Sequence, residues 1–260
     1  MTVTLELAGF RPLAPVNATL QAMFGGVYVP ALAPGLIVSD QPGWSTTELL
    51  TGPALDTLLA SAGRRWNAQP HAAAALAWKT YAYWLALPAV LGWVSARRVP
   101  LITAGNTMMS FTNPDVLITI GVRAGTPIAV LPTDDLALRG HPDAVVVPDE
   151  AALLAEFRRS LLDEHLAPLL DAFHSRVRLG KRLLLGSLAS GIAYGILRSA
   201  DTTPGPSATS IDLLLSTLGI RDLIDLVPTT HGQLDVQRKT CCLAFTLPQP
   251  KICPGCCIKP

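Results

Sequence analysis

Short stretches in which apolar and polar residues alternate recur along the chain and predict strands. Between residues 99 and 148 these stretches follow one another closely, separated by turn signals at Asn113-Pro114, Gly125 and Gly140. Since parallel strands need long crossover connections, these tight connections predict a small antiparallel sheet. The predicted strands are residues 3–7, 35–38, 100–104, 116–122, 128–131, 144–147 and 234–238.

Apolar residues at helical spacing fill much of the remaining chain. The capping-box pattern Ser45-Thr46-Thr47-Glu48 predicts a helix over residues 46–62. Asp149 predicts an N-cap for a helix that reaches about residue 176 and bends at Pro168. Further helices are expected over residues 181–199 and from Ser210 or Ser207 to about residue 218. The predicted fold class is α+β, mainly helical with a small antiparallel sheet: an α+β domain over residues 1–230 and a C-terminal cysteine-rich segment over residues 231–260.

Residues 70–96 carry a single formal charge, Lys79. A membrane-spanning helix needs about 20 apolar residues, and this run falls a little short once Lys79 is excluded. It is rich in alanine and contains Pro88, which predicts a kink or a break. We expect a buried central helix packed on all sides. A membrane span over residues 72–96, or a helix lying at a membrane surface, is the alternative.

The predicted helix 181–199 is unusual for its many small residues. They are Gly186, Ser187, Ala189, Ser190, Gly191 and Gly195. Small side chains let another backbone approach closely. Two interpretations follow: tight packing against a second helix, or close approach of a ligand or of the cysteine-rich segment.

Composition excludes some classes of function. Half of the 260 residues are hydrophobic and 15% are charged, so the chain can bury a large core. With a formal charge of +1 and no basic run, we expect no nucleic-acid partner. The N-terminus lacks a basic start followed by an apolar core, so we expect no secretory signal and a cytoplasmic protein. Location at the inner face of the membrane, by weak association, is kept as an alternative.

All 5 cysteines lie between residues 241 and 257. In the cytoplasm such a group indicates metal ligands rather than disulfides. Two adjacent cysteines, Cys241 and Cys242, precede the pair Cys253 and Cys256, and Cys257 is left over. Structural zinc sites separate paired ligands by two to four residues, so an adjacent pair favours a centre with more than one metal ion. A [2Fe–2S] cluster takes four thiolates, which fits this count. A four-cysteine zinc site remains open at this point.

The segment resembles a known signature. Arg238-Lys239-Thr240-Cys241-Cys242, then Leu247-Pro248, then Cys253-Pro254-Gly255-Cys256 are similar to the C-terminal signature of the FhuF family of [2Fe–2S] ferric-siderophore reductases. Weaker similarity covers residues 165–169 and 186–190, and the first 150 residues agree only in general layout. The resemblance implies that Cys241, Cys242, Cys253 and Cys256 bind a [2Fe–2S] cluster and that Cys257 does not.

The resemblance also implies a function. It is one-electron reduction of siderophore-bound Fe(III) in the cytoplasm, with no catalytic side chain beyond the cluster. The expected partners are a ferric siderophore and an electron donor such as a ferredoxin or a flavin reductase. Arg238, Lys239 and Lys251, with Lys259, are candidates for tuning the cluster or docking these partners; ordinary solvated cations are the equally weighted alternative.

Three rival functions stay open. They are a siderophore-binding protein stabilised by zinc, a general iron–sulfur electron carrier, and an ATP-dependent siderophore synthetase, part of which the family's helical region resembles. The chain length and the lack of a glycine-rich phosphate loop weigh against synthesis.

The remaining polar residues show no recognisable site. The five histidines have no metal-ligand spacing, and His165 and His174 fall on roughly opposite faces of one predicted helix. Asp134-Asp135 and the pair Asp222 and Asp225 have no evident partner, so solvated loops and helix ends are expected for them.

Overall fold

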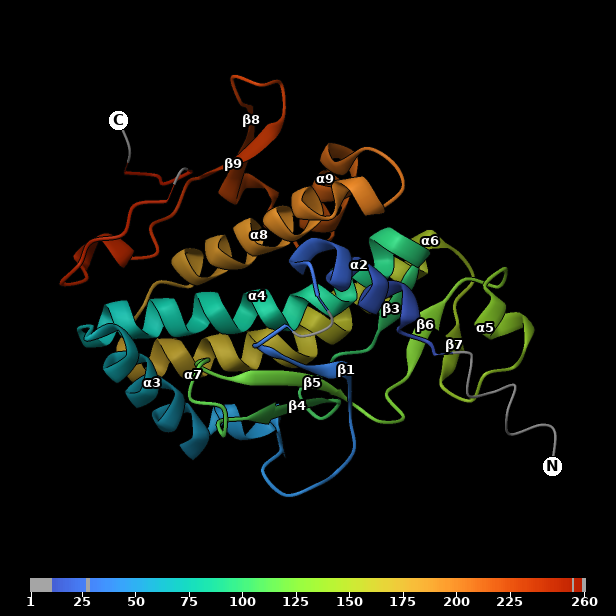
Figure 1. The fold of residues 1–260 in the computed structure, drawn as a ribbon, viewed down its shortest axis with the longest axis horizontal. Helices are drawn as coiled ribbons and strands as arrows, with labels where there is room; N and C mark the ends of the chain where they lie inside the picture. Colours follow the sequence, from blue (N-terminus) through green and yellow to red (C-terminus); the bar gives the residue numbers. More distant parts are fainter. Residues whose placement is uncertain (1–10, 27–28, 254, 259–260) are drawn as a thin grey trace.

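A computed structural model describes residues 11–26, 29–253 and 255–258 of the chain. The predicted strand 3–7 and Lys259 lie outside the described residues. The α+β class is confirmed: helices form the body of the molecule, and small sheets lie at its edges (Figure 1). The α-helices are α2 (Ala14–Phe24), α3 (Pro53–Trp66), α4 (Pro70–Ala96), α5 (Asp135–Leu138), α6 (Glu150–Arg158), α7 (Ala167–Val177), α8 (Lys181–Arg198) and α9 (Ser207–Thr217).

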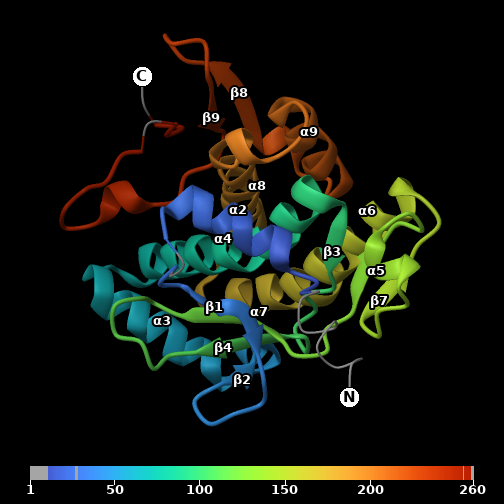
Figure 2. The ribbon, with the colours of Figure 1, turned by 45° about the vertical axis from the view of Figure 1, so that its right-hand side comes forward.

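Helix α4 is the centre of the fold, as expected. It packs against α2, α3, α7 and α8, and Figures 1 and 2 show it enclosed between α8 on one side and α7 on the other. Trp78, Tyr81 and Trp93 are almost completely buried along it. Pro88 does not divide the helix, which continues to Ala96. In the described ranges, no helix combines the length and the apolar character that a membrane crossing requires.

The strands form three small sheets. The first has the order β1-β5-β4-β2, the second β3-β6-β7, and the third is the hairpin β8-β9. Their bounds are β1 (Leu32–Val38), β2 (Ser45–Thr46), β3 (Arg98–Pro100), β4 (Thr107–Ser110), β5 (Thr119–Arg123), β6 (Ile128–Val130), β7 (Ala144–Val146), β8 (Ile224–Pro228) and β9 (Leu234–Arg238).

The prediction of a purely antiparallel sheet is wrong in two places. β1 pairs with β5 and β6 pairs with β7, both in parallel. Between β6 and β7 the chain crosses over through the short helix α5, a connection that looked too short from the sequence. β1 comes from a distant part of the chain and needs no local crossover, because α3 and α4 lie between it and β5.

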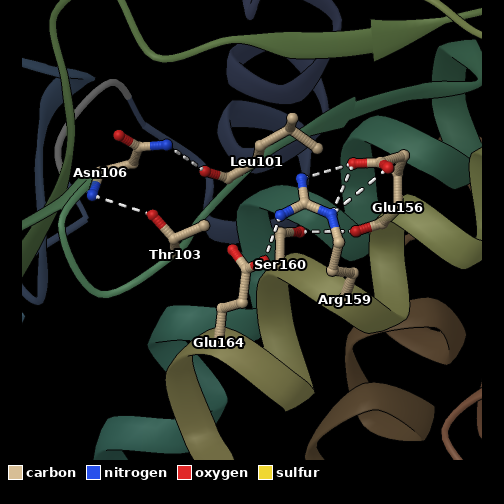
Figure 3. Close-up of polar contacts among 7 residues, drawn as sticks. All are labelled: Leu101, Thr103, Asn106, Glu156, Arg159, Ser160 and Glu164. Carbon is tan, nitrogen blue, oxygen red and sulfur yellow. Dashed lines mark hydrogen bonds and ion pairs between the residues drawn. The ribbon is translucent and has the colours of Figure 1, made fainter.

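The loop after β3 replaces all but the first residue of the predicted strand 100–104. Asn106 Nδ2 donates to the carbonyl of Leu101 at 2.9 Å, and the Asn106 amide donates to Thr103 Oγ1 at 3.2 Å (Figure 3). These bonds close consecutive turns, so the strand ends at Pro100. Asparagine and threonine side chains commonly stabilise turns in this way and compete with strand pairing.

The helix predicted over residues 149–176 forms, and Asp149 caps it by accepting the Ala152 amide at 2.9 Å. Its middle, Arg159–Leu166, is a π-helix that ends just before Pro168. Proline cannot donate an amide to the preceding turn, and a wider turn accommodates that loss. The wide turn also aligns residues five apart: Arg159 bonds both Glu156 and Glu164 (Figure 3).

The helix predicted over residues 46–62 begins later than expected. Thr46 belongs to β2, and its side chain makes no capping bond. A 3-10 turn, Thr47–Thr51, comes first, and α3 starts at Pro53, where proline suits the first helical position. Three further 3-10 turns are Ala200–Thr202, Arg221–Leu223 and Ala244–Thr246.

Candidate metal centre and adjoining pocket

Strand β9 and helix α8 position the first half of the cysteine segment, which we define as residues 239–258. β9 ends at Arg238, two residues before Thr240. Thr240 packs directly on Gly186 of α8: a Cβ added to Gly186 would lie 1.9 Å from Thr240 Oγ1. The small residue at position 186 is therefore required for the chain to approach α8 immediately before Cys241. Other small residues of α8 face α4, since Gly191 lies under Tyr83 and Gly195 under Leu87. Both interpretations of the small-residue helix hold, each on its own face.

The second half of the segment folds back onto the end of β9. The Arg238 amide donates to the carbonyl of Gly255 at 2.9 Å, and Gln237 Nε2 donates to the carbonyl of Cys256 at 3.1 Å. Gly255 lies so close to β9 that an added Cβ would be 1.7 Å from the carbonyl oxygen of Val236. These contacts bring the two cysteine groups, twelve residues apart in the sequence, to the same end of one strand.

The adjacent cysteines Cys241 and Cys242 have different surroundings. Cys241 Sγ accepts the Leu243 amide at 3.3 Å, and Leu243 has a φ of 60°, so the chain turns sharply after Cys242. Cys242 is buried in an apolar cluster with Leu76, Ala244 and Leu247. Among residues 11–26, 29–253 and 255–258, no three His, Cys, Asp or Glu side chains converge closely enough to hold a metal ion. The ligand assignment therefore remains a prediction.

The thiols differ in their electrostatic surroundings. Burial, the largest effect on the Cys242 thiol, opposes its ionisation, but the charges of Lys79 and Arg238 and the Ala244 amide together lower its pKa. The pKa of Cys257 is raised, first by burial and then by its neighbours Cys241 and Cys256. Cys257, which the resemblance leaves out of the ligand set, thus lies beside two of the predicted ligands.

Arg238 is a buried cation with spare donors. Its side chain is 3% exposed, and Nη2 donates to Ser187 Oγ at 2.9 Å. Its Nε and Nη1 atoms have no hydrogen-bond partner in the described structure. Its charge lowers the pKa of Cys242, although no hydrogen bond of ordinary geometry joins the two side chains. A buried guanidinium without acceptors is costly, so these donors favour an anion beside them, such as the ionised Cys242 thiolate or a bound anionic group.

The chemistry of the donor set suits a [2Fe–2S] cluster, although the sulfur atoms do not converge in the described structure. Soft thiolates are the ligands that such clusters take, and the segment carries two groups of them at one strand end. The cluster with four thiolates is a net anion, and the unpaired donors of Arg238 supply the complementary charge. Cys241, Cys242, Cys253 and Cys256 would hold it.

A pocket of about 650 Å³ adjoins the cysteine segment, and Cys253 forms part of its wall. The pocket lies between α4, α8, the end of β9 and the cysteine segment. Its polar wall includes Ser187 and Ser190, and its aromatic wall consists of Trp66, Tyr83, Trp84 and Tyr194. Burial, followed by the charges of Asp235 and Cys253, raises the pKa of Tyr194 to about 12 and keeps this phenol neutral.

The cations predicted near the cluster occupy different places. Arg238 and Lys251 both line the pocket. Lys239 instead forms an exposed ion pair with Asp225 at 2.7 Å, which gives that carboxylate the partner the sequence did not reveal. Lys79 and Arg198, which were not singled out from the sequence, also line the pocket; only their contacts across helices α4 and α8 identify them.

His165 lies in a structural network away from the cysteines. Its Nδ1 donates to the Ile102 carbonyl at 2.7 Å, so Nε2 is left to accept the Tyr81 hydroxyl at 2.6 Å. Burial lowers the pKa of His165 to about 4. Asp134 also has a partner that was not expected: it bonds Arg98 at 2.8 Å and caps α5.

Comparison with known proteins gives a distant likeness to a solved structure. No protein-family profile matches the sequence, and no curated protein matches it. A solved structure with a similar course of the chain is the ATP-bound aerobactin synthetase IucA from a hypervirulent pathotype of Klebsiella pneumoniae, with a TM-score of 0.49 and 16% identity. The likeness covers 66% of this chain and 31% of the synthetase, so the chain spans about a third of that protein's length. It assigns no residue a role.

Proposed function

We propose that this protein is a ferric-siderophore reductase with a [2Fe–2S] cluster held by Cys241, Cys242, Cys253 and Cys256. The observation that carries the proposal is the shared wall between the cysteine segment and the pocket. Cys253 and Lys251 belong to both, so a molecule in the pocket lies against the segment that would hold the cluster. A bound [2Fe–2S] cluster supplies one-electron transfer.

The surrounding residues account for binding and for the balance of charge. The aromatic wall and the cations of the pocket suit a chelate with an apolar body and anionic oxygen donors. One electron converts the bound Fe(III) to Fe(II), and no proton or covalent bond changes partner in that step. A ferredoxin or flavin reductase supplies the electron. Hard oxygen donors hold Fe(II) less tightly than Fe(III), so reduction releases the metal.

Anaerobic purification with iron, acid-labile sulfide and zinc analysis tests the cofactor. We expect a coloured protein with two iron atoms and two sulfides per chain, and an EPR signal after reduction with dithionite. A colourless protein with stoichiometric zinc would exclude the cluster and leave a four-cysteine zinc site.

Replacement of single cysteines by serine tests the ligand set. Substitution of Cys241, Cys242, Cys253 or Cys256 should lower the cluster content sharply, whereas Cys257→Ser is the matched control and should retain it. The control is stringent, because Cys257 lies beside Cys241 and Cys256. Retention of the cluster in Cys242→Ser together with its loss in Cys257→Ser would contradict the assignment and make Cys257 the fourth ligand.

A further inference from the structure

The pocket beside the cysteine segment has an uneven distribution of charge. Its cationic lining residues are Lys79, Arg198, Arg238 and Lys251. Asp235 is the one carboxylate among the described lining residues, and it accepts the Val236 amide at 2.7 Å. A partly enclosed space with this excess of one sign concentrates the field and favours an anionic occupant.

These cations lack the counter-ions that other surface cations of α8 have. Arg182 pairs with Asp222, and Lys181 pairs with Asp171. By contrast, no ion pair formed within the described chain involves any of the four pocket cations. Arg238 is buried and Lys79 is half-buried, whereas Arg198 and Lys251 are exposed. Arg198 and Lys251 are therefore the pocket cations most accessible to a molecule that enters the pocket.

The uncharged lining points to aromatic groups in the occupant. Tyr83 and Trp84 meet edge to face, with ring centroids 4.9 Å apart, and both line the pocket. Arg198 stacks over Phe24, its guanidinium carbon 4.7 Å from the ring centre, which holds the guanidinium at the pocket wall. The buried Tyr83 hydroxyl and the Arg238 Nε and Nη1 atoms have no hydrogen-bond partner in the described structure. An occupant with aromatic rings would pack on the aromatic wall, and its oxyanions would accept hydrogen bonds from these unpaired donors.

We infer that this pocket selects ferric chelates of net negative charge built from aromatic oxyanion donors, of the tricatecholate type, over neutral or cationic chelates. The inference rests on the proposed function and specifies its substrate class. A tricatecholate complex of a trivalent metal carries its negative charge on phenolate oxygens at the edge of aromatic rings, which is the combination that the lining complements. A neutral trihydroxamate complex offers neither the charge nor the rings.

Calorimetric titration with redox-inert gallium(III) complexes tests the inference without electron transfer. The probes are the gallium complex of a hexadentate tricatecholate, a neutral gallium trihydroxamate and a cationic gallium trihydroxamate, each at low and high salt. We expect the tricatecholate complex to bind about tenfold tighter than either hydroxamate complex, because it gains charge-assisted contacts, and to lose this advantage in salt.

Two pocket variants test the inference, and two variants outside the pocket are their matched controls. Arg198→Gln and Lys251→Gln should each weaken binding of the tricatecholate complex by about fivefold to tenfold and leave the neutral complex unaffected. Arg182→Gln and Lys181→Gln remove the same side chains from paired sites on the surface of α8 and should change binding by less than about twofold.

The outcomes separate this inference from the proposed function. Equal binding of the three gallium complexes, or wild-type binding in both pocket variants, would overturn the charge selection even in a protein that reduces ferric chelates. Tighter binding of flavin mononucleotide, which is also aromatic and anionic, would overturn it in favour of a site for the electron donor. Charge selection in a protein that carries no iron would instead refute the reductase and keep the anion pocket.

Discussion

The contact between Gly186 and Thr240 predicts a specific effect of adding one methyl group. In Gly186→Ala the new Cβ would lie 1.9 Å from Thr240 Oγ1 and 2.8 Å from Thr240 Cβ. Since ordinary contacts of a Cβ begin near 3.4 Å, Thr240 Oγ1 must move by about 1.5 Å and Thr240 Cβ by about 0.6 Å. Cys241 follows directly, so the displacement reaches the first predicted ligand.

Gly191→Ala is the matched control on the same helix. There the added Cβ would lie 3.4 Å from the Tyr83 ring, an ordinary contact. Both substitutions gain about 0.5–1 kcal/mol because alanine loses less backbone entropy in a helix. Only Gly186→Ala also overpacks its site, which costs about 1–3 kcal/mol. The difference between the two variants therefore isolates the contact with Thr240.

Urea unfolding and iron content after anaerobic reconstitution are the two assays. We expect Gly186→Ala to be about 1–3 kcal/mol less stable than Gly191→Ala and to hold less cluster. Adding Thr240→Ala to Gly186→Ala should recover part of the lost stability and part of the lost cluster. It removes the atom nearest to the new methyl group, a hydroxyl that is buried without a partner in the described structure. Equal stability and equal iron content in the two single variants would refute the view that α8 positions the cysteine segment.

Three other predictions use separate features. In the unfolded chain His165 gains a proton below its ordinary pKa of 6.5, whereas in the native protein it gains one only near pH 4. Between pH 7.5 and 5 the free energy of unfolding should therefore fall by ~2 kcal/mol more in the wild type than in His165→Gln. Urea titrations measure this slope, and His231→Gln, at an exposed site, is the control that should keep the wild-type slope. Asp134→Ala should lower the free energy of unfolding by about 2–3 kcal/mol, because the cap of α5 and the partner of the mostly buried Arg98 are lost together. Thermal or urea unfolding measures this, and a loss no larger than that of Asp135→Ala would contradict it. Arg238→Gln should make the reduction potential of the bound cluster more negative by roughly 60 mV, because a nearby positive charge favours the reduced form. Voltammetry measures the potential, and an unchanged value would mean that Arg238 does not lie beside the cluster.

Local signals in the sequence predicted the elements whose ends are set by single residues. Helix α8 occupies nearly the expected range after Gly180, β9 matches its alternating pattern, and Asp149 caps α6 as expected. In each case the stabilising bond or the pattern lies within a few residues of the chain, so no tertiary information is needed.

Elements that depend on distant partners were missed. β4, Thr107–Ser110, is buried at every position, so it lacks the alternation that marks a half-exposed strand. β8 was not predicted at all, and its strand exists through pairing with β9. The capping-box pattern at Thr46 failed because that residue pairs with Met108 of β4 instead. Tertiary pairing overrides local propensity in these places.

The sequence predicted the group of thiols in the candidate site, but it did not predict the buried arginine and the pocket that surround them. The spacing of the cysteines indicated a metal centre and, by resemblance, a cluster. It could not reveal that Arg238 is buried with two unpaired donors, because burial depends on Ser187 of α8. The pocket combines Trp66 with Lys251 and Cys253, residues that are far apart in the chain, so it forms only where α3, α8 and the cysteine segment pack around α4.

Oxidation of the dithionite-reduced protein by ferric siderophores is the most direct test of the proposed function. Stopped-flow absorption under anaerobic conditions would follow the cluster, and a colorimetric Fe(II) chelator would count the released iron. We expect one Fe(II) to appear for each cluster reoxidised, and the rate to saturate with siderophore concentration as a binding pocket requires. A reduced cluster that stays reduced in the presence of every ferric siderophore tested would contradict it and make the protein a general electron carrier.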